Sequence, residues 1–393
     1  MSSPTLCFAT RSVGEFSETW MWRQIIGFRR FRTHVLTWRY KHRERFPLGD
    51  VPVTIQREAV CWPEKTAWFT RRIHRLRNLP GRNFFATTRR EYAAIGKTIS
   101  AIRPDVLLCQ HGPMGLRMLP VAREFGIPLA VHFHGTDLAG ALANPWYRWS
   151  LKSALHQFDA IIVVNMKQRD WLVEQEVKPE KIHVIPCGVP TDECVPPPAA
   201  ERDEMPPRFI AVGRLVQLKG VDVTIRAFER VVSEVPQAQL VIVGEGPRRE
   251  ELEVLVDDLG LRNNVCFTGW LSQDEVRRAL RGSNVFVQHS LVPEGWPVSV
   301  AEASAMGLPV VVTNCGGLAE QVVDGVTGLI VPMRDVRAMH EAMLKLARSP
   351  NLRMDMGMAG RTRMIQEFDV KKQIAKLEEA LMSCVSFNCK NHE

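Results

Sequence analysis

Two basic side chains, Arg214 and Lys219, lie in segment 213–220, which reads GRLVQLKG. The segment follows an apolar run typical of a strand and precedes a stretch with helical spacing. Gly213 lets the backbone pass close to a ligand, and a guanidinium and an ammonium can bind one anion together. The segment therefore predicts an anion site. The alternative is two solvated cations on a loop, because short motifs often match by chance.

Two carboxylates, Glu294 and Glu302, lie eight residues apart in segment 293–302, which reads PEGWPVSVAE. Pro297 is a favourable first residue of a helix, so we expect Glu294 in a loop and Glu302 inside the helix. Such a pair can contact two parts of an extended, hydroxyl-rich ligand. The alternative is that Glu294 caps the helix and Glu302 is simply exposed. Three backbone amides near the start of this helix are expected to be free to bind an anion: those of Gly295, Trp296 and Val298.

Segment 132–137, which reads HFHGTD, ends another apolar run. His134 falls at the end of that run, where an imidazole can donate a hydrogen bond or move a proton. His132 lies among apolar neighbours and is expected in the core. Asp137 is expected to cap the segment that follows it. His134 and Glu294 are therefore the candidate catalytic side chains.

Three other kinds of site are disfavoured. Segment 244–249, GEGPRR, begins like a dinucleotide-binding loop, but Arg249 replaces the third glycine. No Asp-x-Asp occurs, so the usual carboxylate clamp for a catalytic metal is missing, and we expect neither a metal nor a cofactor. The nine cysteines include no Cys-x-x-Cys, which disfavours a zinc site or a disulfide framework and favours a reducing cytosol.

Strand-like and helix-like segments alternate along most of the chain, which predicts parallel sheets covered by helices on both faces. A proline-rich stretch at 191–207 interrupts the alternation and is predicted to be a linker. We therefore predict two doubly wound α/β domains facing a cleft, at 1–190 and 208–370. Residues 371–393 are expected to form a helix and tail that pack back on the first domain, frayed from about Ser383.

The predicted elements place all three segments just after strands, where parallel sheets bind ligands. Predicted strands are 33–38, 105–109, 128–133, 159–164, 181–185, 208–212, 239–243, 264–268, 284–288, 309–312 and 328–331. Predicted helices of the second domain are 220–235, 247–259, 272–281, 298–306 and 335–348.

Composition and charge narrow the possibilities further. Of the 393 residues, 45% are hydrophobic and 24% are charged, which is a globular composition. No apolar run is long enough to span a membrane, and no basic leader precedes the apolar run that begins at Leu6. The net charge of +8 is uneven, because the first hundred residues hold 19 basic and 7 acidic side chains. That asymmetry predicts an anionic partner for the first domain.

Taken together, three motifs of the second domain resemble those of GT-B glycosyltransferases of family 4. They are GRLVxxKG at 213–220, VGxGP at 243–247, and EGxPV at 294–298 with its second glutamate eight residues on. The resemblance covers nearly all of 208–332. In the first domain, EFSETW at 15–20 and FHGTD at 133–137 resemble segments of the colanic-acid and exopolysaccharide branch.

The resemblance implies a retaining transfer of a sugar from a nucleoside-diphosphate sugar to a saccharide or lipid-linked acceptor. It implies that Arg214 and Lys219 hold the diphosphate and that Glu302 holds the ribose hydroxyls. Glu294 and the amides after it are implied to hold the sugar. Because a nucleoside diphosphate gains negative charge as it leaves, fixed cations and a helix N-terminus suit it without a metal.

The same resemblance implies that His134 lies near the reacting carbon and places Gly14, Glu18 and Asp137 on the acceptor side. Many relatives carry paired glycines in the first loop, whereas only Gly14 is present here. A nucleotide-sugar epimerase and a non-catalytic binding protein with a retained donor fold are the alternatives. The joint presence of the motif residues favours the transferase.

Basic and aromatic side chains interleave in the first hundred residues, which predicts a cytosolic protein that docks peripherally on anionic lipid. The alternative is a solvated basic face. Nucleic-acid binding is disfavoured, because the charge is diffuse and no reading helix or zinc finger is present. The residues concerned are Trp20, Trp22, Phe28, Arg29, Arg30, Phe31, Arg32, Trp38, Arg39, Tyr40, Lys41, Arg43, Arg45, Trp68, Phe69, Arg71, Arg72 and Arg75.

Overall fold

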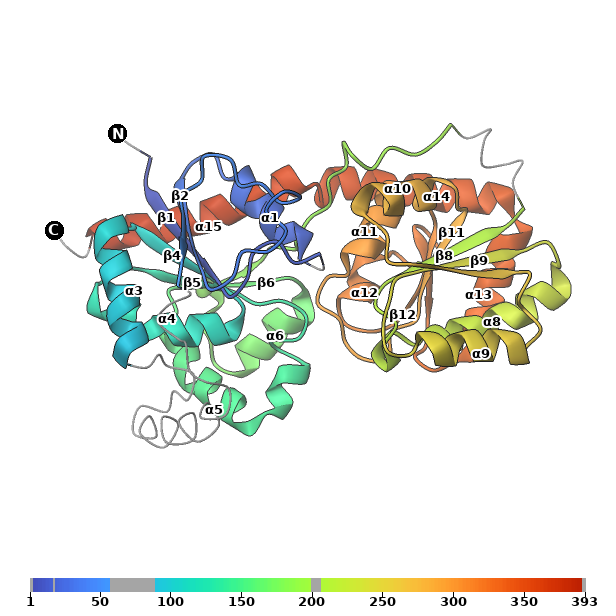
Figure 1. Ribbon diagram of the computed structural model, residues 1–393, viewed down its shortest axis with the longest axis horizontal. Helices are drawn as coiled ribbons and strands as arrows, with labels where there is room; N and C mark the ends of the chain where they lie inside the picture. Colours follow the sequence, from blue (N-terminus) through green and yellow to red (C-terminus); the bar gives the residue numbers. More distant parts are fainter. Residues whose placement is uncertain (1–2, 17, 57–88, 199–205, 391–393) are drawn as a thin grey trace. The chain divides into compact units, whose positions relative to one another are not determined.

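The chain divides into two compact units, residues 1–187 with 371–393 (unit 1) and residues 188–370 (unit 2). The computed structural model describes residues 3–16, 18–56, 89–198 and 206–390. Figure 1 shows a sheet with helices packed around it in each unit. All strand pairs between named strands are parallel, which confirms the prediction of two doubly wound α/β domains.

The sheet of unit 1 has seven strands in the order β3-β2-β1-β4-β5-β6-β7. The chain moves outward from β1 to one edge and then resumes at β4 on the other side of β1. Ligands of such sheets bind where the strand order reverses, at the carboxyl ends of β1 and β4. The strands are β1 (Thr5–Thr10), β2 (Arg32–Thr37), β3 (Val53–Ile55), β4 (Val106–Gln110), β5 (Leu129–His132), β6 (Ala160–Val163) and β7 (Ile182–Val184).

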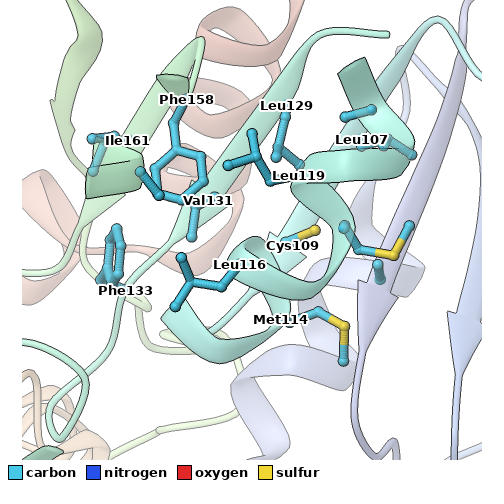
Figure 2. Close-up of a cluster of buried hydrophobic side chains, with 14 of the residues drawn as sticks. Leu107, Cys109, Met114, Leu116, Leu119, Leu129, Val131, Phe133, Phe158 and Ile161 are labelled. Atoms are coloured by element: carbon cyan, nitrogen blue, oxygen red, sulfur yellow. The ribbon is translucent and has the colours of Figure 1, made fainter. Parts of the chain in front are cut away.

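The central strands of unit 1 are buried on both faces, which explains their nearly continuous apolar sequences. Figure 2 shows Leu107 of β4 and Val131 of β5 in the cluster that also contains Leu116 and Leu119 of α4 (Gly112–Glu124). A Cβ on Gly115 would lie 2.6 Å from the Val131 side chain. The small residue therefore lets α4 pack close to the sheet and fixes where its N-terminus lies.

The last helix, α15 (Val370–Lys390), belongs to unit 1 for almost all of its length. The backbone amides of Arg29 and Arg30 both donate to Glu378 Oε1 at 2.7 Å, and Glu378 is buried. The prediction of a frayed tail from Ser383 is wrong, because the helix continues to Lys390. Buried Leu377, Leu381 and Cys384 keep one apolar face of the helix in contact with the unit as far as Cys384. The other helices of unit 1 are α1 (Thr19–Gly27), α3 (Arg89–Ile102), α5 (Pro145–Ala154) and α6 (Met166–Glu174).

The sheet of unit 2 has six strands in the order β10-β9-β8-β11-β12-β13, so its order reverses between β8 and β11. The strands are β8 (Arg208–Val212), β9 (Gln239–Val243), β10 (Val265–Gly269), β11 (Val285–Gln288), β12 (Val310–Thr313) and β13 (Gly328–Val331). The helices are α8 (Val221–Glu234), α9 (Arg249–Asp258), α10 (Gln273–Arg281), α11 (Val298–Ala305), α12 (Gly317–Gln321), α13 (Val336–Arg348) and α14 (Pro350–Glu367).

Alternate residues of β11 face the two helix layers of unit 2. Val285 and Val287 pack in the cluster that contains side chains of α8 and α13, whereas Phe286 packs in the one that contains α11. Figure 1 shows α8, α9 and α13 on one side of this sheet and α10, α11 and α14 on the other. Because both faces are covered, the carboxyl edge of the sheet is the place where polar side chains can gather.

The predicted strands all exist, and each of their ends lies within one residue of the predicted position. Two helices begin later than their prolines predict. Pro297 is the N-cap of α11 rather than its first residue, and Pro247 precedes α9 by two residues. Strands β1 and β3 were not predicted; β1 follows the N-terminus closely and β3 has three residues. Within the predicted linker, Cys194 is buried in the core of unit 2, and 199–205 lie outside the described residues.

Candidate functional site

The anion segment predicted from the sequence lies where the sheet of unit 2 reverses its order. Gly213 directly follows β8, Arg214 is exposed, and Lys219 ends a single 3-10 turn, η5 (Gln217–Lys219). These three residues line a small pocket together with Gln288 and His289 from the end of β11. The two basic side chains are therefore carried at the ligand-binding edge of the sheet.

The VGxGP motif supports this segment from the neighbouring strand β9. A Cβ on Gly244, which has φ +135°, would lie 1.9 Å from the Gly213 carbonyl oxygen, and a Cβ on Gly246 would lie 2.3 Å from that of Leu215. Glycine is needed at both positions because the two loops touch through their backbones. The motif therefore has a structural role in holding the segment that carries Arg214 in place.

Lys219 and Glu294, which come from separate motifs, contact each other. Lys219 Nζ lies 2.5 Å from Glu294 Oε2, and only 22% and 17% of the two side chains are exposed. Glu294 Oε1 accepts hydrogen bonds from Gln288 Nε2 at 2.7 Å and from Ser290 Oγ. The predicted diphosphate contact and the predicted sugar contact thus form one cluster. The alternative in which Glu294 caps the helix is not observed, since Pro297 occupies the cap position.

Helix α11 begins beside this cluster and carries Glu302 as its fifth residue, half-buried. Gly295 and Trp296 connect Glu294 to the helix. The Trp296 side chain is only 7% exposed, and its ring centroid lies 4.7 Å from that of Phe368. Its side chain is thus used for packing, and only its backbone is left to contact a ligand.

In unit 1, His134 lies after β5 and is almost completely buried. Its Nε2 donates to Gln110 Oε1 at 2.9 Å, because the Gln110 amide nitrogen is directed at Gln24. Its ring centroid lies 3.9 Å from that of Trp20 and 4.2 Å from that of His132. Burial, with smaller effects from His132 and His111, holds the pKa of His134 well below its usual range. The neutral form of the ring is therefore favoured.

The structure adds His111, which sequence reasoning missed. It follows β4, at the reversal of strand order, and has φ +70°. Its Nδ1 lies 3.0 Å from Asp137 Oδ2 and its Nε2 lies 3.5 Å from Glu18 Oε1. Burial alone would lower the pKa of His111, but hydrogen bonds and charges from Asp137 and Glu18 raise it to about 10. The signal in the sequence was a histidine two positions after the apolar run 106–109.

The residues predicted for the acceptor side have distinct positions. Glu18 and Asp137 both contact His111, and Asp137 also accepts a hydrogen bond from the His134 backbone amide at 2.8 Å. Asp137 therefore faces back toward β5. The expectation that it caps the segment after it is wrong. Gly14, with φ +81°, lies so close to Lys41 that a Cβ would be 2.0 Å from the Lys41 carbonyl oxygen. Glycine is therefore needed at position 14 for a structural reason, the close approach of the Lys41 backbone.

Within the described part of the chain, no three His, Cys, Asp or Glu side chains are arranged to hold a metal ion. The helices described here include none that is long and apolar enough to cross a membrane. Seven of the nine cysteines are described, and all seven are free thiols. Ser17 and the basic and aromatic residues predicted at 68–75 lie outside the described residues.

Comparisons with known proteins agree with this arrangement. The family described as "Glycosyl transferases group 1" matches residues 197–363, and the family described as "Glycosyltransferase Family 4" matches residues 29–193. A GDP-mannose-dependent alpha-(1-6)-phosphatidylinositol monomannoside mannosyltransferase from Mycolicibacterium smegmatis is 31% identical over 277 residues, covering 67% of this chain and 72% of the relative.

A putative colanic acid biosynthesis glycosyltransferase, WcaL, from Salmonella typhimurium is 27% identical, covering 70% of this chain and 71% of the relative. Among solved structures, Anabaena HepE in complex with UDP matches with a TM-score of 0.78 and 17% identity. That match covers 96% of this chain and all of the other. At this identity the structural match bears on the fold alone.

Proposed function

Because the chain is a glycosyltransferase of family 4 with the GT-B fold, we propose that it moves a sugar from a nucleoside-diphosphate sugar to a saccharide or lipid-linked acceptor in polysaccharide or glycolipid biosynthesis. The observation that carries the donor assignment is the contact between Lys219 and Glu294 where the order of the unit 2 sheet reverses. An ammonium suits a diphosphate and a carboxylate suits sugar hydroxyls, so one cluster serves both halves of the donor.

In this proposal Arg214 and Lys219 bind the diphosphate and stabilise the charge that develops on it as the bond to the sugar breaks. The backbone amides of Trp296 and Val298, at the start of α11, add further donors. Glu302, within α11, binds the nucleoside end. We propose that transfer is retaining and needs no divalent metal, since two fixed cations and a helix N-terminus can stabilise the leaving group.

Unit 1 is proposed to carry the acceptor through Glu18, Asp137 and His111. The charged His111 holds both carboxylates in place, leaving their remaining lone pairs to accept hydrogen bonds from acceptor hydroxyls. His134 is proposed to line the site as a neutral group and not as a proton carrier, since its pKa is lowered by burial. The free thiols fit a reducing cytosol as the place of action.

A thermal-shift panel of UDP, GDP, ADP and their sugars tests the donor assignment, because a ligand that binds the folded state raises the melting temperature. We expect one nucleoside diphosphate to stabilise the protein and its sugar to be slowly hydrolysed. NMR of the first-formed product then reports whether the anomeric configuration is retained. No shift and no hydrolysis with any donor would contradict the proposed function, and activity lost in EDTA and restored by magnesium or manganese would contradict metal independence.

A further inference from the structure

The two oxygens of the Glu294 carboxylate have different kinds of partner. Oε1 accepts hydrogen bonds from two neutral donors, Gln288 Nε2 and Ser290 Oγ, whereas Oε2 contacts the Lys219 ammonium. Gln288 is 6% exposed and Ser290 is completely buried. Two buried neutral donors on one oxygen fix the plane of the carboxylate, so only the other oxygen can readily exchange its partner.

Both neutral donors are held by a further layer of hydrogen bonds. Ser299 Oγ, in the first turn of α11, donates to Gln288 Oε1 at 3.2 Å. The Ser290 amide donates to Thr313 Oγ1 at 3.1 Å, and Thr313 Oγ1 donates to the Ser290 carbonyl at 3.0 Å. Thr313 is completely buried at the end of β12. The network joins β11, β12 and α11, which are rigid elements of unit 2.

Lys219 differs from these residues in its freedom to move. Its ammonium group is carried by a flexible four-carbon stem that extends from a short 3-10 turn, and the side chain is 22% exposed. A diphosphate offers more negative charge than one carboxylate, so a bound donor competes with Glu294 for the ammonium. When the ammonium turns to the phosphates, Glu294 keeps its two neutral partners and its position.

We infer that Gln288 and Ser290 are positioning residues that hold the Glu294 carboxylate toward the sugar while Lys219 changes from Glu294 to the diphosphate of the donor. The inference rests on the proposed function and adds two residues that no motif predicts. A carboxylate held in place stabilises the cationic sugar most strongly in the transition state. Gln288 and Ser290 therefore affect turnover and leave the affinity for the free nucleoside diphosphate unchanged.

The test uses the variants Ser290→Ala and Gln288→Met. For each, turnover is measured at a saturating concentration of the donor sugar, and the affinity for the nucleoside diphosphate is measured by calorimetry. Each variant loses one hydrogen bond to a charged group, so turnover should fall about tenfold or more while the affinity stays within about twofold. Ser283→Ala is the matched control, because Ser283 is a buried serine whose hydroxyl donates to the Ala279 carbonyl at 2.8 Å, outside this network. It should keep full turnover.

The decisive variant is the double mutant Ser290→Ala with Glu294→Gln. If Ser290 acts through Glu294, its loss costs much less turnover once the carboxylate is gone, because the two residues act as one unit. Equal losses in both backgrounds would overturn the inference, as would a matching loss of diphosphate affinity in Ser290→Ala. Wild-type turnover is measured first: its absence contradicts the proposed function, whereas normal turnover in Ser290→Ala contradicts only this inference.

Discussion

In each of the two candidate sites, charged side chains are paired with side chains of opposite charge. Lys219 is neutralised by Glu294 in unit 2, and His111 is neutralised by Glu18 and Asp137 in unit 1. Because each partner is partly shielded from water, removing one member leaves the other with an altered affinity for ligand. Two predictions follow from these pairs, one for binding and one for stability against pH.

The first concerns the Lys219–Glu294 pair. Lys219→Ala removes a charge-assisted contact of about 1.5–3 kcal/mol, so affinity for the nucleoside diphosphate should fall roughly ten- to a hundredfold. Glu294→Gln frees Lys219 and removes a negative charge beside the phosphates, so it should bind the diphosphate as well or up to about fivefold more tightly, the range of a partly exposed ion pair. Calorimetric titration measures both. Weaker binding in Glu294→Gln would show that the carboxylate does not compete for Lys219.

The second concerns His111, whose pKa in the folded protein is raised to about 10. A raised pKa contributes stability that is fully present below the pKa of the unfolded chain, about 6.5, and is lost as pH rises through the folded value. Wild type should therefore lose stability relative to His111→Gln between pH 7 and 10, as measured by denaturant unfolding. His183→Gln is the control: burial lowers the pKa of His183, so its effect should not change over that range.

At the scale of elements, α15 shows how the C-terminal residues stabilise the N-terminal half of the chain. Glu378 accepts two backbone hydrogen bonds from the segment after α1, and Ile374 lies against Gly27. The helix thus closes a contact between positions about 350 residues apart in sequence. Its loss should affect unit 1 and leave the contact between Lys219 and Glu294 in unit 2 intact.

We therefore expect Glu378→Gln to destabilise unit 1 by about 1–3 kcal/mol, because a buried carboxylate that accepts two amide hydrogen bonds is replaced by a weaker acceptor. Glu379→Gln is the matched control, because Glu379 is the next residue on the same helix and is exposed. Hydrogen exchange of β1 and β2, read against β8 and β11, measures the effect unit by unit. Equal loss of protection in the two units would contradict the assignment of α15 to unit 1.

At the scale of the whole molecule, the excess of basic side chains in the first hundred residues remains a prediction of membrane docking. The described cations Arg39, Arg43 and Arg45 are exposed after β2. Surface cations contribute about 1 kcal/mol each on anionic lipid, so replacing all three by Gln should weaken vesicle binding about a hundredfold.

Co-sedimentation with anionic vesicles tests this docking, and binding should weaken as salt rises because the Debye length shrinks. A control variant replaces three exposed arginines of unit 2, at positions 226, 278 and 281, by Gln. It makes the same change in net charge and should bind as wild type does. Equal binding to neutral and anionic vesicles would rule the docking surface out.

The sequence alone determined the features that depend on local order along the chain. Alternating apolar strands and amphipathic helices predicted both doubly wound sheets, because strand and helix periods differ and each buries its own apolar face. The candidate donor residues Arg214, Lys219, Glu294 and Glu302 could be proposed from the sequence because each motif lies in a short segment between a strand and a helix or at the start of that helix.

The tertiary structure decided which of these residues meet. Lys219 and Glu294 are 75 positions apart, and their contact depends on β8 and β11 being neighbours in the sheet. The pKa of His111 is raised by Glu18 and Asp137, which lie in other segments of the chain, and its positive φ is visible only in the folded backbone. The course of α15 along unit 1 likewise rests on the distant backbone amides of Arg29 and Arg30. Contacts of this kind depend on strand order and packing, and neither is encoded in the spacing of residues along one segment.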